Sequence, residues 1–285
     1  MLSHSKTLRA FSKASRSLTG QVQSAPYSSL QGKVIAISGA GSGIGLATAK
    51  HLYPMGVRLS LTDNREEVLR AAIPQITSSS STSDDSIYST VTNVRSSKQV
   101  NTWIEGTVEK FGALDGAANL AGVVHKRIGI ADITEMTDEE WSFVNDINLT
   151  GVFYAVRAQL QAMEKLGKGG SIVNAASTAG IEGNAKNANY SAAKHGVVGL
   201  SRSAAKEAGR KGIRVNAIAP GVIDTPMVQT LPKVMSSAMG QLLAGQALGR
   251  RAQPGEMAKL ITFLLSDESS FTTGAVYVAD GGQVC

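Results

Sequence analysis

A tyrosine and a lysine four positions apart, Tyr190 and Lys194, are the pair of side chains in this sequence most suited to proton transfer. Residues at this spacing share one face of a helix, so the phenol would lie beside the ammonium group. Because a nearby cation favours the phenolate, we expect the pKa of Tyr190 to lie below its usual value of about 10. The same spacing occurs on ordinary exposed helices. The interpretation therefore depends on the surrounding elements, including Ser177 at the end of a predicted strand.

A glycine-rich turn separates a short apolar strand, residues 33–38, from a helix that ends near residue 54. Glycines at such a place let the chain turn sharply and approach a pyrophosphate, which the helix N-terminus stabilises through its free N–H groups. The residues expected to make this contact are Gly39, Ser42, Gly43, Ile44 and Gly45. The turn therefore predicts a dinucleotide site.

An acidic residue, Asp63, follows the second predicted strand, residues 57–62. A carboxylate at this place can accept hydrogen bonds from the adenosine ribose and repels a 2′-phosphate, which predicts NAD rather than NADP. Arg65 lies close enough to accommodate a phosphate, so NADP remains an alternative. A carboxylate that only stabilises the start of the next helix is a second alternative for Asp63.

Strands and helices alternate along the rest of the chain. Further strands are expected at residues 87–92, 114–118, 171–176, 214–219 and 275–279, and helices at residues 64–76 with an interruption at Pro74, then 96–111, 137–166, 190–210 and 254–265. This alternation predicts a single doubly wound, Rossmann-type α/β domain, with a seven-stranded parallel sheet and helices on both faces.

The N-terminal residues have a different composition. Four basic residues, Lys6, Arg9, Lys13 and Arg16, lie among serines and apolar residues, and no acidic residue precedes Asp63. This composition is typical of a mitochondrial transit peptide, which would direct the protein to the matrix. A terminal tail without an address, in a cytoplasmic protein, is the alternative. In both cases we exclude residues 1–29 from the fold and assign the catalytic domain to residues 30–285.

The overall charge of +6 depends on this tail. Without it the remaining surface is ordinary, so nucleic-acid binding is not expected. No apolar run approaches the ~20 residues that span a bilayer.

Taken in order, these motifs resemble those of the short-chain dehydrogenase/reductase family from residue 33 to residue 282. The family's Asn-x-Ala-Gly motif matches residues 119–122, its nicotinamide-contacting segment matches residues 220–227, and its C-terminal Asp-Gly-Gly matches residues 280–282. The chain departs from the family pattern at Asn93, where aspartate is common, and at Leu120, where asparagine is common.

The resemblance implies a catalytic set of Asn148, Ser177, Tyr190 and Lys194. Tyr190 would transfer the proton, Lys194 would lower its pKa and hold the nicotinamide ribose, Ser177 would bind the substrate oxygen, and Asn148 would anchor a proton relay through water. The implied cofactor contacts are Gly39, Ser42, Gly43, Ile44, Gly45, Asp63, Asn93, Val94, Asn119, Ala121, Gly122, Tyr190, Lys194, Pro220, Gly221, Ile223 and Thr225. No metal site is expected, and the family implies a homo-oligomer, a dimer or a tetramer.

The substrate is the least defined part of this prediction. By family analogy residues 225–253 cover it, and their flexible apolar side chains, such as Met227, Leu231 and Met239, suit a hydrophobic secondary alcohol or ketone. A helix that only packs on the core explains the same pattern. Two other functions remain open: a non-catalytic NAD-binding or sensor protein, and an epimerase or dehydratase on the same fold.

Overall fold

The computed structural model describes residues 27–78, 84–231 and 234–284. The N-terminal tail expected over residues 1–29 lies outside these ranges up to residue 26, and residues 232–233 of the expected covering segment also lie outside them. Within the described ranges, no helix is both long enough and apolar enough to cross a membrane.

Over these residues, seven parallel strands form one sheet in the order β3-β2-β1-β4-β5-β6-β7. They are β1 (Val34–Ser38), β2 (Arg58–Asp63), β3 (Ile87–Val91), β4 (Gly116–Asn119), β5 (Gly170–Ala175), β6 (Ile213–Pro220) and β7 (Val276–Ala279). The inner strands are buried along almost their whole length, as is usual for parallel strands covered on both faces. The expected seven-stranded parallel sheet is confirmed.

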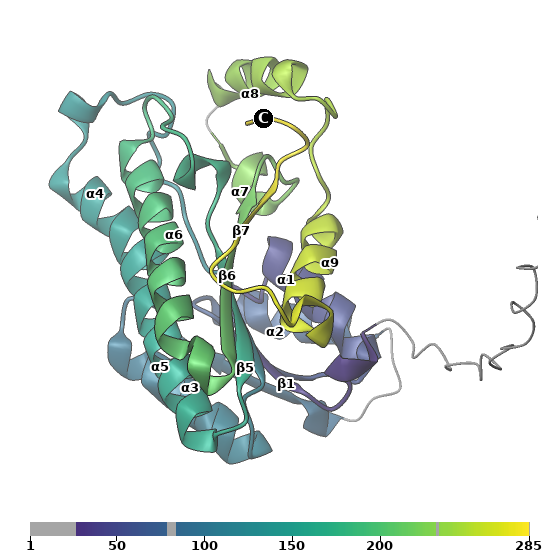
Figure 1. Cartoon of the computed structure of the whole chain (residues 1–285). Coiled ribbons are helices and arrows are strands. Elements are labelled where there is room, and N and C mark those ends of the chain that lie inside the picture. The colour runs from purple at the N-terminus through teal and green to yellow at the C-terminus, as the bar shows by residue number, and fades with distance from the viewer. Residues whose placement is uncertain (1–26, 79–83, 232–233, 285) are drawn as a thin grey trace, which may run out of the picture.

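Helices pack on both faces of the sheet (Figure 1). One layer contains α1 (Gly43–Leu52), α2 (Glu66–Thr77) and α9 (Pro254–Leu265), and the other contains α3 (Ser97–Phe111), α5 (Gly151–Leu166) and α6 (Ala188–Ala208). Each layer closes over its own apolar core, with Leu52, Tyr53 and Ile261 in the first and Trp103 and Met163 in the second. The fold is the doubly wound α/β domain that the alternation predicts.

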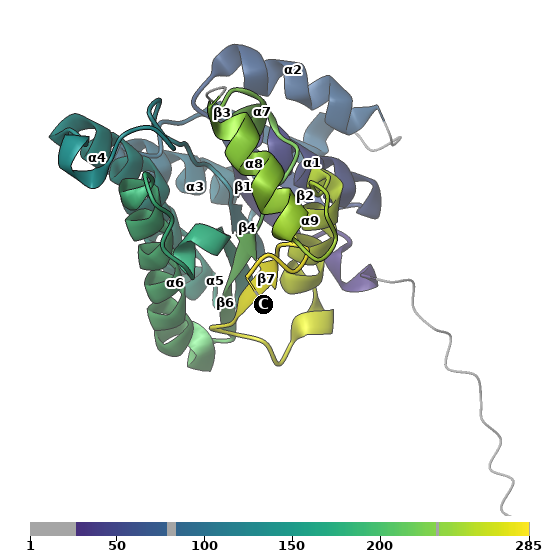
Figure 2. The ribbon, with the colours of Figure 1, turned by 90° about the horizontal axis from the view of Figure 1, so that it is seen from above.

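The chain reverses its direction of travel across the sheet between β3 and β4, because β4 pairs with β1 on the side opposite to β2. At such a switch point the connections from the two central strands continue to opposite sides of the sheet and leave a crevice outside its carboxyl end. Helices α7 (Pro226–Gln229) and α8 (Val234–Gly245) lie across this end of the molecule (Figure 2).

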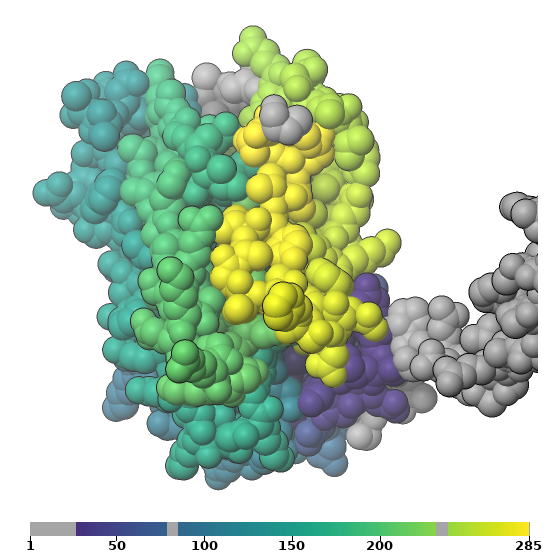
Figure 3. All heavy atoms as spheres, in the orientation of Figure 1, coloured from purple at the N-terminus to yellow at the C-terminus, as the bar shows by residue number. Residues whose placement is uncertain are grey.

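The C-terminal segment closes one side of the same end. In the space-filling view it lies between the green surface of α6 and the lime-green segment that carries α8 (Figure 3). Backbone hydrogen bonds of 2.9 Å from Leu248 N to Gly281 O and of 3.3 Å from Ala247 N to Gly282 O join it to the residues after α8. The expected covering segment is therefore tied to the end of the chain.

One local prediction was wrong. Helix α2 continues through Pro74, where the sequence predicts an interruption. Proline removes one backbone donor, but Pro74 is exposed and lies near the end of the helix, so water can bind the carbonyl left free. The buried residues Leu69, Ala72 and Ile76 keep the helix on the sheet.

Candidate active site

The loops after β1 and β4 lie in direct contact at the switch point. The hydroxyl of Ser38 accepts hydrogen bonds from the backbone N–H groups of Leu120, at 3.1 Å, and Ala121, at 3.3 Å. Gly39 has a φ of +67°, and a Cβ there would lie 2.9 Å from the Cα of Ala121. Only glycine therefore allows this approach, which brings the glycine turn and the residues of the Asn-x-Ala-Gly motif to one crevice.

The N-terminus of α1 offers a place for phosphate. A Cβ at Gly45 would collide with the carbonyl oxygen of Gly39, so the helix starts tightly against the turn. Ser42 is the N-cap residue, and its hydroxyl makes no capping hydrogen bond. The free N–H groups at the start of a helix, its dipole and this hydroxyl together fit an anionic group.

Asp63 lies beneath the same turn at the end of β2. Its side chain is almost fully buried and accepts hydrogen bonds of 3.2 Å from the backbone N–H groups of Gly41 and Arg65. The Nε of Arg65 lies 3.6 Å from Oδ1 of Asp63, while half of the arginine side chain is exposed. A carboxylate oxygen can accept more than one hydrogen bond, so both oxygens keep capacity for ribose hydroxyls.

Two residues of the cofactor prediction use their side chains within the protein. The amide of Asn119 is buried, and it exchanges hydrogen bonds with Gln159 and donates one of 2.8 Å to Oδ1 of Asn174. Asn93 accepts a 3.0 Å hydrogen bond from the backbone N–H of Arg95. Asn119 therefore joins β4 to β5 and α5, and any contact with a cofactor would come from its backbone.

The remaining predicted cofactor residues follow β3 or lie at and after the end of β6. Val94 lines a small space beside Ala121 and Ser38. At the end of β6, Pro220 is followed by Gly221, where a Cβ would lie 2.8 Å from the Cα of Asp280. Ile223 pairs with Ala252 in an isolated parallel bridge.

Thr225 brings the segment after β6 to the glycine turn. A Cβ at Gly43 would lie 3.2 Å from Cγ2 of Thr225, the N-cap residue of α7. The turn that fits a pyrophosphate and the segment expected to contact the nicotinamide therefore lie side by side.

Tyr190 and Lys194 lie on one face of α6, as their spacing predicts. Nζ of Lys194 is 5.5 Å from the centre of the Tyr190 ring and donates a 2.7 Å hydrogen bond to the carbonyl of Ala175 at the end of β5. Ser177 follows that strand, accepts a 3.2 Å hydrogen bond from Ala179 N, and lies near enough to the phenol of Tyr190 to affect its pKa. The structure thus brings the serine, the tyrosine and the lysine together.

Asn148 reaches the same place from a distorted helix. Residues Asp146–Thr150 form a π-helical turn between α4 (Asp138–Asn145) and α5, a distortion common at functional sites. The amide of Asn148 donates 2.9 Å hydrogen bonds to the carbonyls of Val123 and Val144 and accepts one of 3.1 Å from Val123 N. It is fully buried and holds the loop after β4.

Gly122 lies between Asn148 and Lys194. A Cβ at this position would lie 2.8 Å from Oδ1 of Asn148 and 3.7 Å from Nζ of Lys194. The two side chains therefore face one small space, which any larger residue at 122 would fill. This arrangement fits the expected relay between them.

The expected pKa of Tyr190 is wrong for the protein alone. Burial raises the pKa of Tyr190 above its usual value, and the nearby hydroxyl of Ser177 offsets only part of this effect. Burial also lowers the pKa of Lys194 to about 8. The spacing of the pair correctly places the ammonium near the phenol. It does not show how far the fold buries both groups, and burial determines the direction of both pKa shifts.

Replacing Lys194 with methionine is expected to stabilise the fold at pH 7. The pKa of Lys194 falls from 10.5 in the unfolded chain to about 8 in the folded protein, so the unfolded chain binds this proton more tightly than the folded protein does. Below pH 8 this difference lowers the free energy of unfolding by about 3 kcal/mol. The lost hydrogen bond to Ala175 reduces the gain. Because wild-type stability should rise between about pH 8 and pH 10.5, the advantage of the variant should shrink over that interval.

Urea denaturation at pH 7 and pH 10 measures both effects. Lys50→Met, on the exposed face of α1, is the matched control and should change stability little at either pH. A Lys194→Met protein less stable than the wild type at pH 7 would contradict the cost assigned to the buried ammonium.

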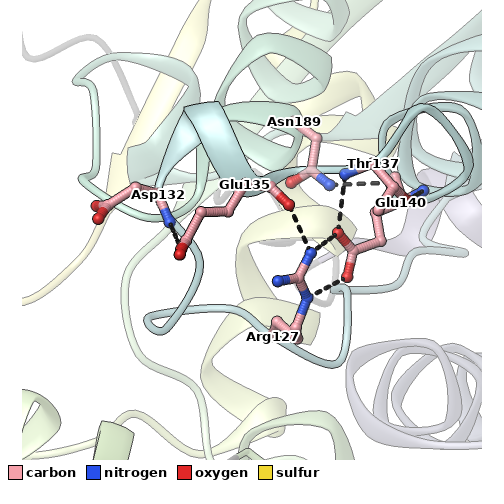
Figure 4. A network of polar contacts seen from close by, with 6 residues as sticks. All are labelled: Arg127, Asp132, Glu135, Thr137, Glu140 and Asn189. Carbon is pink, nitrogen blue, oxygen red and sulfur yellow. Dashed lines mark hydrogen bonds and ion pairs between the residues drawn. The ribbon is translucent and has the colours of Figure 1, made fainter.

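A network of polar contacts, drawn in Figure 4, joins α4 to the start of α6, and the sequence alone does not predict it. Asn189 donates a 3.0 Å hydrogen bond to the carbonyl of Glu140 and accepts one of 2.8 Å from Tyr190 N. The carboxylate of Glu140 receives two hydrogen bonds from Arg127, at 2.8 and 2.6 Å, which hold the pKa of Glu140 down at about 2. The sequence signals only a helix cap at Thr137 and Glu140, so the link from this cap to the start of α6 needs the structure.

No group of three or more His, Cys, Asp or Glu side chains able to hold a metal ion occurs among the residues described.

Residues 39–283 match a family model described as enoyl-(acyl carrier protein) reductase. The short-chain dehydrogenase/reductase aba4 of Botryotinia fuckeliana is 47% identical over 256 residues, which cover 89% of this chain and 97% of that protein. The 2,5-dichloro-2,5-cyclohexadiene-1,4-diol dehydrogenase of Sphingobium indicum is 36% identical over 90% of this chain and 98% of that protein.

Levodione reductase of Leifsonia aquatica is 39% identical over 91% of this chain and 97% of that protein. A crystal structure of levodione reductase matches the fold with a TM-score of 0.84, over 89% of this chain and 98% of that chain. These similarities therefore cover nearly the whole of each protein.

Proposed function

Because the chain belongs to the short-chain dehydrogenase/reductase family, we propose that it transfers a hydride between NAD and a hydrophobic secondary alcohol or ketone, with Tyr190 as general acid and base. The observation that carries the proposal is the meeting of Ser177, Tyr190 and Lys194 at the carboxyl end of β5, beside a crevice that fits a dinucleotide.

The family binds a nicotinamide cofactor, which supplies the hydride donor or acceptor when bound. In the direction of reduction, Ser177 hydrogen-bonds the ketone oxygen and Tyr190 donates its phenolic proton to that oxygen. A phenol whose pKa is raised is fully protonated at neutral pH, so the protein alone is set to act as a proton donor.

Lys194 and Asn148 complete the proton path. Lys194, with a pKa of about 8, can return a proton toward Tyr190, and Asn148 faces the same small space. In the direction of oxidation the same groups act in reverse, and the phenolate of Tyr190 takes the hydroxyl proton of the alcohol.

NAD is the proposed cofactor because of Asp63. The carboxylate is almost fully buried under the glycine turn and would face the 2′-phosphate of NADP with a like charge. Arg65 does not remove this charge: its Nε is 3.6 Å away and half of its side chain is in solvent, so the pair is a weak, partly exposed one.

The name of one relative, a cyclohexadiene-1,4-diol dehydrogenase, supports a six-membered-ring substrate with two oxygens, and the name of a second, a dione reductase, supports the second oxygen. Levodione reductase and the 2,5-dichloro-2,5-cyclohexadiene-1,4-diol dehydrogenase are both at least 36% identical to this chain over nine tenths of its length. We therefore propose a secondary alcohol or ketone on a six-membered ring, covered by the segment expected over residues 225–253, whose described side chains Met227 and Leu242 are only partly exposed.

A panel of lipophilic ring alcohols and their ketones, each with both cofactors, tests this function. We expect NADH consumption with the ketones, NAD reduction with the alcohols, and slower turnover with the phosphorylated cofactors. Binding of NADH without any turnover would favour the sensor alternative. Conversion of a substrate with no net change in nicotinamide absorbance would favour an epimerase or dehydratase.

A further inference from the structure

A buried histidine lies three residues beyond the Asn-x-Ala-Gly motif. His125 is 3% exposed, and among the described residues neither of its ring nitrogens has a hydrogen-bond partner. The carbonyl of Lys186 lies near the ring without completing a hydrogen bond of good geometry. Buried polar groups are nearly always paired, because leaving one unpaired lowers the stability of the fold. An unpaired buried imidazole therefore suggests a partner that arrives with a ligand.

The loop that carries His125 is held against the catalytic residues. Two residues before it, Val123 exchanges hydrogen bonds of 3.1 and 2.9 Å with the amide of Asn148. Further along, Gly129 N donates a 3.0 Å hydrogen bond to the carbonyl of Lys186, in the segment that leads into α6 and Tyr190. His125 thus lies where the loops after β4 and β5 meet, at the carboxyl end of the sheet.

Lys186, whose carbonyl lies near His125, has an uncommon backbone conformation. Lys186 has a φ of +60°, a left-handed conformation that is uncommon for a residue with a side chain. Such conformations persist where the surrounding structure imposes them, and they are frequent next to ligands.

The charged neighbours of His125 are already engaged with each other. Arg127 and Glu140 share two short hydrogen bonds, and Arg127 also donates a 2.8 Å hydrogen bond to the carbonyl of Glu135 (Figure 4). Burial and the charge of Arg127 lower the pKa of His125 below 6.5, and Glu140 and Lys186 offset only part of this. The ring is therefore neutral at pH 7, with one donor and one acceptor nitrogen.

We propose that His125 binds a second oxygen of the substrate, a hydroxyl or carbonyl oxygen on the side of the ring away from the reacting carbon. A neutral imidazole matches both groups, because it can donate to a carbonyl and can donate to or accept from a hydroxyl. The proposal rests on the proposed function and extends it: the reacting oxygen goes to Ser177 and Tyr190, and the distant one goes to His125.

Paired substrates test this assignment. Cyclohexane-1,4-dione has the second oxygen and cyclohexanone lacks it, and both are measured with NADH and the full-length protein. We expect wild-type kcat/KM to favour the dione by about tenfold or more, the typical effect of one buried hydrogen bond. His125→Leu should lower kcat/KM for the dione by about tenfold and leave that for cyclohexanone nearly unchanged.

Two further variants control for folding. His125→Asn keeps a donor and an acceptor and should recover part of the preference for the dione. His51→Leu makes the same chemical change at the end of α1, far along the chain from the catalytic residues. It should leave kcat/KM unchanged for both substrates. Thermal unfolding without ligand should show that His125→Leu is at least as stable as the wild type, since it removes an unpaired buried group.

Equal losses of activity with both ketones in His125→Leu would mean that the histidine only shapes the loop, and would overturn the proposal. Unchanged activity with both would overturn it as well. A wild-type protein that reduces neither ketone nor any other ring ketone contradicts the proposed function itself. That result is distinguished from the other two because it appears before any substitution is made.

Discussion

Replacing Tyr190 with phenylalanine should lower kcat by about a thousandfold while NADH still binds with nearly the wild-type affinity. The variant loses one oxygen atom, the phenolic oxygen that is proposed to transfer the proton, on a ring whose centre lies 5.5 Å from Nζ of Lys194. Without it the substrate oxygen has no acid to protonate it. Serine and lysine remain in place, so the cofactor crevice is unchanged.

Stopped-flow or steady-state absorbance of NADH measures turnover, and nicotinamide fluorescence measures binding. Tyr88→Phe, on the edge strand β3, is the matched control and should keep full activity. A Tyr190→Phe protein with the wild-type kcat would show that another group transfers the proton.

Replacing Asp63 with asparagine should weaken NADH binding by about tenfold and strengthen NADPH binding. Asparagine has the same size, and its one amide oxygen can still accept the hydrogen bond from Gly41, so the glycine turn should keep its shape, while the hydrogen bond from Arg65 N is lost. What changes is the charge: the ribose hydroxyls lose a charged acceptor, and a 2′-phosphate no longer meets a buried anion. Arg65, freed from its 3.6 Å contact with the carboxylate, can then pair with the phosphate.

Fluorescence titration with NADH and NADPH gives both dissociation constants. Asp85→Asn, at an exposed carboxylate paired with Lys110, should change neither dissociation constant. Adding Arg65→Leu to Asp63→Asn should remove the gain in NADPH affinity. An unchanged ratio of the two affinities in Asp63→Asn would show that the carboxylate does not face the ribose.

Much of the fold follows from local patterns in the sequence. Helix α9 begins and ends where Pro254 and the apolar run to Leu265 predict, and Gly112 ends α3 with a φ of +66°. These features depend on one or two residues and their neighbours. Pro74 is different, because the burial of Leu69 and Ile76 against the sheet outweighs the local preference of proline.

The sequence predicts which residues of the site lie close together. It predicts less well which contacts each side chain makes and how its pKa changes. Glycine turns and spacing indicate the crevice and the Tyr190–Lys194 pair. The side chain of Asn119 turns instead into a buried amide network with Gln159 and Asn174, and the pKa of Tyr190 moves up because the fold excludes water. Both outcomes depend on packing between distant elements. The ring of His125, which has no partner among the residues that the structure describes, has the same origin, since only the folded chain buries it.

The central claim is hydride transfer at this site, and isotopic labelling tests it most directly. NADH carrying deuterium at C4, in each of the two stereochemical forms, would be incubated with the wild-type protein and a reducible ring ketone, and the product alcohol analysed by mass spectrometry. The account predicts one deuterium on the carbinol carbon from one form of labelled NADH and none from the other, with no label transferred by Tyr190→Phe over the same time. Alcohol formed without deuterium from either form would contradict it.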